Sequence, residues 1–315
     1  MKENKLISII VPCYNEEEVL ELFYSELNNI TNSIHKYNTE VIFVDDGSTD
    51  KTKDIIHNLA SLNSKVKYIT FSRNFGKEAA MLSGLRNALG DLVVIMDADL
   101  QHPPHLLLEM ISGIEEGYDS VATKRRNRNG EPIIRSYFAK LFYKIINKTS
   151  KITITEAATD YRLMNRKVVD SVLKLSEYNR FTKGIFEWVG FKTKWIEIDN
   201  VERVAGQTTW SFWSLLTYAI EGIVSFSVAP LKIASILGSI ISISSFLYAM
   251  YIFIRTLAFG KDVPGYASLL CIVLFMGGIQ LISIGVIGEY LSRTYLEVKN
   301  RPNYIADESN IEEIK

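Results

Sequence analysis

Residues 93–104, Val-Val-Ile-Met-Asp-Ala-Asp-Leu-Gln-His-Pro-Pro, decide the fold of this chain. Four apolar residues in a row predict a buried strand, and the Pro-Pro pair stops it. Asp97 and Asp99 follow at the carboxyl end of that strand, where side-chain alternation aims both carboxylates the same way. Two carboxylates at such an edge suit a hard divalent cation, Mg²⁺ or Mn²⁺, that also binds phosphate oxygens. The simpler interpretation is a strand that ends in a solvated acidic turn.

Three earlier segments repeat this pattern of an apolar strand followed by polar residues. Strands are expected at 6–11, 41–44, 66–71, near 120–123 and at 194–198. With the strand at residue 93 counted as the fourth, helical segments lie between the first four strands, at about 16–37, 51–62 and from 77 to about 89. This alternation predicts an α/β fold with a mostly parallel sheet. Because such sheets bind ligands at the carboxyl ends of their strands, the polar residues there are expected to share one site.

The composition excludes some classes of protein. The 315 residues carry a net charge of −1, from 35 basic and 36 acidic residues, so we expect no nucleic-acid partner. The two cysteines, Cys13 and Cys271, have no metal-ligand spacing and predict no disulfide framework. Residues 1–5 are polar and lead straight into a strand, so we expect no signal peptide and a cytosolic N-terminal domain.

The C-terminal third predicts a membrane segment. Residues 211–230 are amphipathic and aromatic, which indicates an interfacial helix or a core helix. Two uncharged stretches follow, at 233–254 and 263–288, each long enough to cross a bilayer. Arg293, Lys299 and Arg301 then favour a cytosolic tail, whose acidic end from about Asp307 is expected to be disordered. The expected division is therefore a catalytic domain at 1–210, the interfacial helix at 211–230, a two-span hairpin at 231–292 and the tail at 293–315.

A basic region lies before these segments. It comprises residues 124–128 and an amphipathic stretch at about 134–148. It forms a solvated basic face, or it binds an acceptor phosphate or an anionic membrane surface.

Several motifs together resemble glycosyltransferase family 2, and more narrowly the polyprenyl-phosphate sugar transferases, which include dolichol-phosphate mannose synthase and the bactoprenol glucosyltransferases. The resemblance covers about residues 6–292 and includes the Asp-Tyr-Arg-Leu segment at 160–163 and the Arg-x-x-Gly-Gln-Thr segment at 203–208. The other motifs are Val11-Pro12-x-Tyr14-Asn15-Glu16, Val44-Asp45-Asp46-Gly47-Ser48, Arg73-Asn74-Phe75-Gly76-Lys77 and the Asp97–Pro104 segment. The resemblance implies a GT-A, Rossmann-like domain that uses a nucleotide-sugar donor and Mg²⁺ or Mn²⁺.

The resemblance also implies roles for the strand-end residues. Asp97 and Asp99 would hold the metal. The nucleotide would contact Pro12, Tyr14, Glu16, Asp45, Asp46, Arg73, Lys77 and Asp97. Turn capping remains the alternative for Asp45 and Asp46, and a helix start is the alternative for Lys77.

Asp160 falls in the segment that supplies the catalytic carboxylate of the family, as a base or a positioning group; an ion pair with Arg162 is the alternative. Arg203 and Gln207 match a loop that closes over the diphosphate, although Thr209 stands where many relatives have lysine. The acceptor phosphate would be bound by Arg125, Arg135 and Ser136.

Taken together, these features predict a multi-pass enzyme of the bacterial cell membrane that moves one sugar, with inversion, from a nucleotide-sugar to undecaprenyl phosphate. The resemblance favours UDP-glucose or UDP-N-acetylglucosamine as donor, a homo-oligomer, and a downstream flippase and transferase as partners. Two alternatives remain. A processive polysaccharide synthase would carry Gln-x-x-Arg-Trp and more spans, whereas this chain has Gln207-Thr-Thr-Trp210. A catalytically silent membrane scaffold would lack the reaction altogether.

Overall fold

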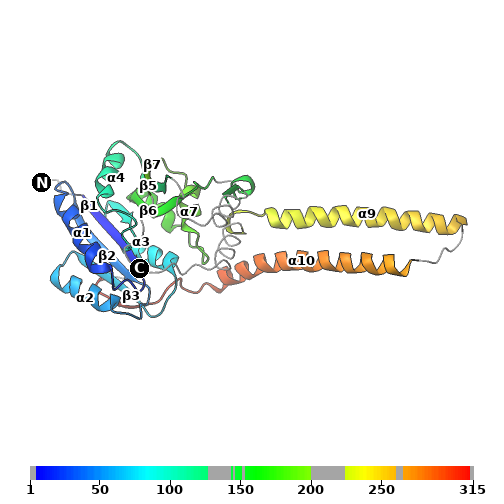
Figure 1. The fold of residues 1–315 in the computed structure, drawn as a ribbon, viewed down its shortest axis with the longest axis horizontal. Helices are drawn as coiled ribbons and strands as arrows, with labels where there is room; N and C mark the ends of the chain where they lie inside the picture. Colours follow the sequence, from blue (N-terminus) through cyan, green and yellow to red (C-terminus); the bar gives the residue numbers. More distant parts are fainter. Residues whose placement is uncertain are drawn as a thin grey trace.

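One mixed sheet organises the catalytic part of the molecule (Figure 1). The computed structural model describes residues 5–126, 143–144, 146–150, 153–199, 224–259 and 265–312. In these ranges the strands run in the order β7-β5-β6-β4-β1-β2-β3-β8. Their bounds are β1 Leu6–Cys13, β2 Asn38–Asp45, β3 Val66–Phe71, β4 Leu92–Ile95, β5 Ser120–Arg125, β6 Ala158–Asn165, β7 Thr193–Ile198 and β8 Ala306–Ser309. The strands at 6–11, 41–44, 66–71, 120–123 and 194–198 are thus confirmed.

Helices cover both faces of the sheet. They are α1 Leu20–Ser33, α2 Thr52–Leu62, α3 Lys77–Asn87, α4 Leu106–Glu115, α6 Arg166–Leu173 and α7 Thr182–Trp188. Successive β1 side chains show the alternation, because Ile9 packs in the core beneath α1 and α4 while Ile10 packs beneath α3 and α6. With both faces covered, the central strands carry buried apolar runs, such as Ile9–Val11 in β1 and Leu92–Ile95 in β4, as parallel strands usually do.

The strand pairing changes from parallel to antiparallel at β4, the strand that leads into the Asp97–Pro104 motif. Strand β4 pairs in parallel with β1 on one side and antiparallel with β6 on the other. From the sequence, β6 is not predicted as a strand, although it contains the Asp-Tyr-Arg-Leu motif at 160–163. Its pairing brings Asp160 to the edge where the parallel strands β1, β2 and β4 end.

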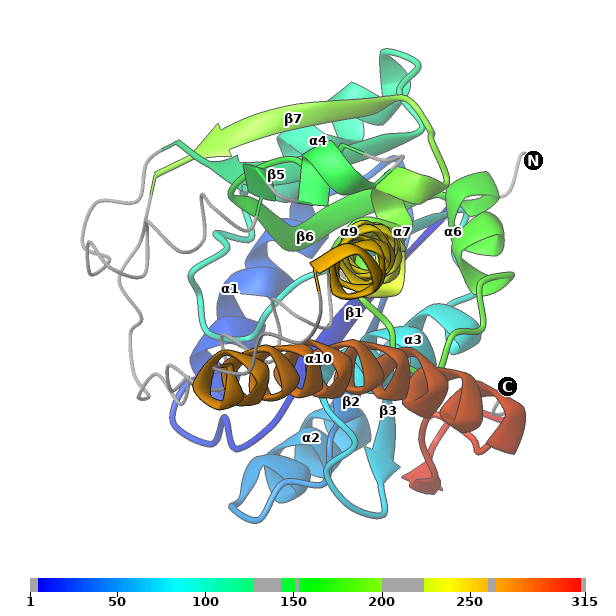
Figure 2. The ribbon, with the colours of Figure 1, turned by 90° about the vertical axis from the view of Figure 1, so that its right-hand side faces the viewer.

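Two long apolar helices leave the domain on one side, α9 Ala229–Phe259 and α10 Tyr266–Lys299 (Figure 1). In Figure 2, α9 is seen end-on and α10 runs at an angle to it. Their mean hydropathies over the candidate spans are 1.8 and 1.9, and neither candidate window buries any of its residues in the protein. A helix of 31 residues extends for about 47 Å at ~1.5 Å per residue, longer than a hydrocarbon core of about 30 Å. Both helices are therefore long and apolar enough to cross a membrane.

Polar contacts join α10 to the segment before α9, and this segment to the catalytic domain, where the Ser227 hydroxyl donates to the Thr149 carbonyl at 3.0 Å. The Tyr290 hydroxyl donates to the Ser227 carbonyl at 2.6 Å, and Arg293 donates to the Ser225 hydroxyl at 2.9 Å. Farther along α10, the Glu297 carboxylate accepts a hydrogen bond from the Tyr178 backbone N–H at 2.8 Å.

The prediction of a disordered acidic tail from about Asp307 is wrong for residues 307–312. The chain returns from α10 to the sheet, and β8 pairs antiparallel with the edge strand β3. In Figure 1 the C-terminus accordingly lies beside the sheet, far from the tip of the hairpin. Composition indicated disorder, but β3 offers an unpaired row of backbone groups, and an edge of this kind accepts a further strand.

Some expected features lie outside the described residues. These are most of the interfacial helix at 211–230, most of the basic stretch at 134–148, and the candidate site residues Arg135, Ser136, Arg203 and Gln207.

Candidate active site

The loops after β1 and β2 are tied together by side-chain hydrogen bonds. Asn15 has a positive φ of 55°, and its side-chain oxygen accepts from the Thr49 backbone N–H at 2.8 Å. In return, the Ser48 hydroxyl accepts from the Asn15 backbone N–H at 3.0 Å, and Thr52 accepts from Glu16 at 2.8 Å. Hydrogen bonds therefore join the motif residues of the two loops.

Asp45 and Asp46 are both buried at the end of β2, but their partners differ. Oδ1 of Asp45 accepts from the backbone N–H and hydroxyl of Ser48, at 3.1 and 2.5 Å, while its buried Oδ2 has no hydrogen-bond partner. Asp46 accepts from the backbone N–H groups of Phe75 and Gly76, at 2.7 and 2.9 Å. Burial raises the pKa of Asp46 to about 6. Asp46 thus anchors the loop after β3, whereas Asp45 keeps one acceptor atom for another group.

Asp45, which carries this unpartnered oxygen, lines a pocket of about 450 Å³. The walls include Tyr14, Asp45, Lys53, Thr70, Arg73 and Asp307. The Thr70 hydroxyl is also buried without a partner. Two orphaned polar atoms and an exposed aromatic ring suit a flat polar ligand such as a nucleobase.

Glycine is required at the floor of this pocket. Gly47 has φ +69°, and a Cβ there would lie 2.5 Å from the Arg73 carbonyl carbon. The loop after β2 and the loop that carries Arg73 can approach so closely only because residue 47 has no side chain.

A second cluster joins three elements around one ammonium group. Lys77, at the start of α3, lies 2.7 Å from Oδ1 of Asp97 after β4 and 2.8 Å from Oδ2 of Asp160 on β6. Lys183 from α7 lies 3.9 Å from the other oxygen of Asp160. Burial acts to raise the pKa of Asp160, but Lys77 and Lys183 outweigh it and hold that pKa below its usual range. Asp160 is therefore a fixed anion.

Asp160 does not form the ion pair with Arg162 that was its alternative role. Arg162 is buried with its guanidinium 3.6 Å from Glu187, and it packs against the rings of Phe186 and Trp195. The ion pair expected as an alternative role for Asp160 is therefore made with Lys77 instead of Arg162.

Sequence reasoning gave no role to His102 or Glu78. His102 is buried with Nδ1 at 3.6 Å from Asp97 Oδ2 and its ring 5.4 Å from that of Tyr161, and burial lowers its pKa. Glu78 accepts from the backbone N–H and hydroxyl of Thr182, which docks α7 beside Lys77. The place of His102 inside the Asp97–Pro104 motif was a signal that could have found it, whereas the Glu78–Thr182 contact spans 104 residues and had no local signal.

Asp97 and Asp99 fit a divalent cation of the Mg²⁺ or Mn²⁺ type. Their carboxylates are hard oxygen donors. Oδ1 of Asp99 also accepts a hydrogen bond from the backbone N–H of Gln101 at 3.1 Å. The Gln101 side-chain oxygen accepts from Arg125 at 3.2 Å, which brings one predicted acceptor residue next to the motif. Among the described residues, His, Cys, Asp and Glu side chains form no group of three that could hold a metal. Two carboxylates fit an ion that completes its coordination with water and substrate phosphates.

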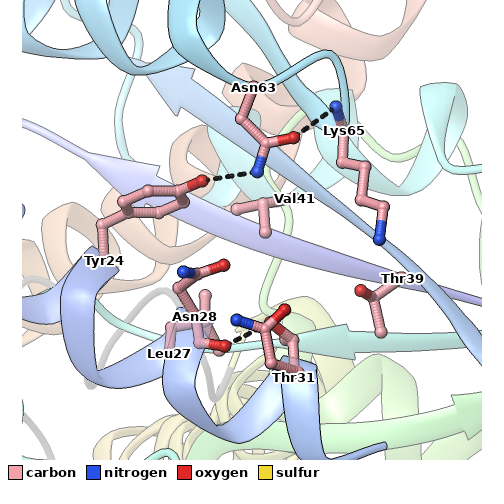
Figure 3. Close-up of a pocket in the computed structure, with 9 residues that line it drawn as sticks. Tyr24, Leu27, Asn28, Thr31, Thr39, Val41, Asn63 and Lys65 are labelled. Carbon is pink, nitrogen blue, oxygen red and sulfur yellow. Dashed lines mark hydrogen bonds between the residues drawn. The ribbon is translucent and has the colours of Figure 1, made fainter. Parts of the chain in front are cut away.

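A smaller pocket lies at the opposite end of the strands (Figure 3). It has a volume of about 100 Å³ between α1 and the sheet, and it is lined by Thr39 and Val41 at the start of β2. Asn63 donates to the Tyr24 hydroxyl across it at 2.9 Å. It lacks the carboxylates of the larger pocket among the nine residues that line it, so the candidate site is placed at the other edge.

Comparison with known proteins agrees with this arrangement. The family model for glycosyl transferase family 2 matches residues 8–173, and the model for the GtrB C-terminal hairpin matches residues 229–294. A putative glycosyltransferase, CsbB, of Bacillus subtilis is 47% identical over 97% of this chain and 92% of its own length. A bactoprenol glucosyl transferase from the SfII prophage of Shigella flexneri is 44% identical over 96% of this chain and 98% of its own.

Among solved structures, a mannosyltransferase of Pyrobaculum calidifontis, bound to GDP-Man and Mn²⁺, superposes with a TM-score of 0.51. It is 17% identical and covers 92% of this chain and 88% of its own, so the likeness concerns the fold. The GT-A architecture followed by two apolar helices is thereby confirmed. The family models and the relatives agree that this chain belongs to the GtrB-like polyprenyl-phosphate glycosyltransferases of glycosyltransferase family 2.

Proposed function

We propose that the protein transfers a single sugar from UDP-glucose or UDP-N-acetylglucosamine to undecaprenyl phosphate, with inversion, at the cytosolic face of a bacterial membrane. The observation that carries the proposal is the arrangement at one sheet edge. A nucleotide-sized pocket, the carboxylates of Asp97 and Asp99, and the fixed anion of Asp160 all lie at strand ends of a domain that is fastened to an apolar hairpin.

The residues divide between the two substrates. Tyr14, Asp45 and Arg73 would hold the nucleoside in the pocket they line. Pro12 lies near the end of β1, where it pairs with Val44 of β2. Glu16 belongs to the loop tied to the pocket, and Asp46 supports Arg73 through the loop after β3. Arg203 and Gln207 would close over the diphosphate.

Asp97 and Asp99 would hold Mg²⁺ or Mn²⁺, which neutralises charge on the leaving diphosphate when bound.

Asp160 would orient the acceptor. A phosphate monoester oxygen is anionic near neutral pH, so it needs alignment with the sugar more than removal of a proton. The contact with Lys77 keeps Asp160 charged and in place, and Arg125, near Gln101, would bind the acceptor phosphate together with Arg135 and Ser136. A single displacement by that oxygen gives a β-linked product from an α-linked donor.

The apolar hairpin supports a membrane location, and we propose that the catalytic domain lies on the cytosolic side. Two spans return the chain to the side it left, which agrees with β8 and the N-terminal domain forming one sheet. The proposed division of the chain is a catalytic domain at 1–210, an interfacial helix at 211–230, a two-span hairpin at 231–292 and a tail at 293–315. A homo-oligomer, a flippase that receives the product and a transferase beyond the membrane complete the proposal.

Transfer from radiolabelled nucleotide-sugars to undecaprenyl phosphate in membranes, with and without Mg²⁺ or Mn²⁺, tests it. A metal-dependent, chloroform-extractable product from one uridine donor is the expected result. Extended polymer would favour a processive synthase. Absence of any lipid-linked product from membranes that contain folded protein would favour the silent scaffold and refute the proposal.

A further inference from the structure

The segment that follows the hairpin is built into the catalytic domain. Tyr304 is buried with its ring stacked 4.8 Å from that of Phe71, and the Ile305 carbonyl accepts from the Ser72 backbone N–H at 3.0 Å. At the other end of β8, the Asn310 side chain accepts from the Tyr68 N–H at 2.7 Å and donates to the Val66 carbonyl at 3.0 Å. These contacts fix β8 in register from both sides.

The register contains an irregularity at the nucleotide pocket. Thr70 pairs with Glu308 and Phe71 pairs with Ala306, so Asp307 is an extra residue on β8. A bulge of this kind redirects a side chain. Asp307 lines the same pocket as Asp45 and Thr70.

β8 also fixes a cation at the rim of that pocket. Lys53, from α2, lies 2.9 Å from the Glu308 carboxylate and 3.9 Å from that of Asp307. Its side chain is 32% exposed and also lines the pocket, so the ammonium group is available to a ligand. A strand that served only to cover the edge of the sheet would need neither this bulge nor two carboxylates beside one lysine, so both features indicate a role in the pocket.

We propose that β8 is part of the donor-nucleotide site, with Glu308 as a positioning residue that holds Lys53 toward the base and Asp307 as a wall of the base pocket. The inference rests on the proposed function, because it takes the occupant to be a nucleoside diphosphate. The orphaned oxygen of Asp45 accepts a hydrogen bond, whereas the Thr70 hydroxyl and the Lys53 ammonium donate. An N–H flanked by two carbonyl oxygens, as in uracil, complements that set.

A double-mutant cycle on the full-length protein tests the inference. Titration calorimetry in detergent measures the Kd for UDP in the wild type, Lys53→Met, Glu308→Gln and the double variant. We expect Lys53→Met to raise Kd about tenfold, since it removes a hydrogen bond from a charged donor. Glu308→Gln should raise it about threefold, because ion pairs this exposed are weak. In the double variant Kd should stay near that of Lys53→Met, since Glu308 acts through Lys53.

Two further measurements separate this role from a structural one. Glu308→Gln and Asp307→Asn should raise the donor KM while leaving the KM for undecaprenyl phosphate, kcat and Tm unchanged. Glu312→Gln is the matched control, because Glu312 is exposed on the same tail and has no ion pair among the described residues. Unchanged UDP affinity in Glu308→Gln and Asp307→Asn, or additive effects in the cycle, would overturn the inference.

The nucleotide panel keeps the two proposals distinguishable. UDP, GDP, CMP and dTDP are titrated against the wild type first, and the cycle is run on whichever binds. Binding of GDP with the expected effect of Glu308→Gln would refute the uridine donor and keep the role of β8. Binding of UDP without that effect would refute only the role of β8, and no binding by any nucleotide would refute both.

Discussion

Replacing Lys77 by methionine is expected to lower turnover strongly and to leave donor affinity almost unchanged. The ammonium group of Lys77 contacts the carboxylates of both Asp97 and Asp160. Methionine has a similar length and no charge, so the substitution leaves the two anions without their shared cation. Lys183, at 3.9 Å from Asp160, is the nearest cation that remains in the described cluster.

The size of the effect follows from the geometry. A hydrogen bond to a charged group contributes about 1.5–3 kcal/mol. The carboxylates of Asp97 and Asp160 are only 20% and 17% exposed, so this range applies, but the 43% exposure of the Lys77 side chain favours the lower limit. Two such contacts give about 3 kcal/mol, and at ~1.4 kcal/mol per tenfold change this lowers kcat about 100-fold. Lys77→Arg keeps the charge and should recover part of the loss.

Single-turnover transfer and titration of UDP separate the two possible roles of Lys77. We expect a lower kcat with a Kd within about threefold of the wild type, since Lys77 is absent from the lining of the nucleotide pocket. Lys174→Met, at the exposed C-terminal end of α6, serves as the control and should change neither quantity. A raised Kd with unchanged kcat would make Lys77 a nucleotide contact, as the family resemblance implied, and would refute this reasoning.

Three other substitutions test the site. Asp99→Ala should abolish Mn²⁺ binding and transfer while Tm stays unchanged; full activity would remove Asp99 from the metal site. Gly47→Ala should raise the donor KM at least tenfold, because a Cβ meets the Arg73 backbone at 2.5 Å, whereas Gly117→Ala, with φ +93° and nothing within 4 Å, should only lower Tm. Burial raises the pKa of Glu78 to about 7, so folded protein binds the proton more tightly than unfolded protein, and Glu78 favours folding most below about pH 4.5. Tm should therefore fall by about 2 °C per pH unit near pH 7, and this slope should be absent in Glu78→Gln.

The parts of the fold that the sequence predicted correctly are those encoded over short distances. Strands such as 66–71 combine an apolar run with polar residues that follow it, so their existence and the shared edge of Asp45 and Asp97 could be inferred locally. The pairing of β6 with β4 could not, because β6 begins some 60 residues after β4 ends and its sequence mixes charged and apolar residues. For the same reason the sequence named Asp160 as functional but did not identify Lys77 as its partner, 83 positions away.

The tail shows the same limit and its consequence for the membrane. Its acidic composition indicates disorder only if the segment is considered alone; Glu308 and Asp307 become favourable once Lys53 lies opposite them. The hairpin is consequently fixed to the catalytic domain before α9, through the hydrogen bond from Ser227 to the Thr149 carbonyl, and again after α10, through β8. A hairpin held at both ends resists tilting relative to the sheet, so if it spans a bilayer it sets the depth of the carboxylate cluster against the head groups.

Cutting the chain between Lys299 and Tyr304 should then reduce transfer to membrane-embedded undecaprenyl phosphate more than transfer to a short, water-soluble polyprenyl phosphate. Equal losses with the two acceptors would show that β8 serves the donor site alone.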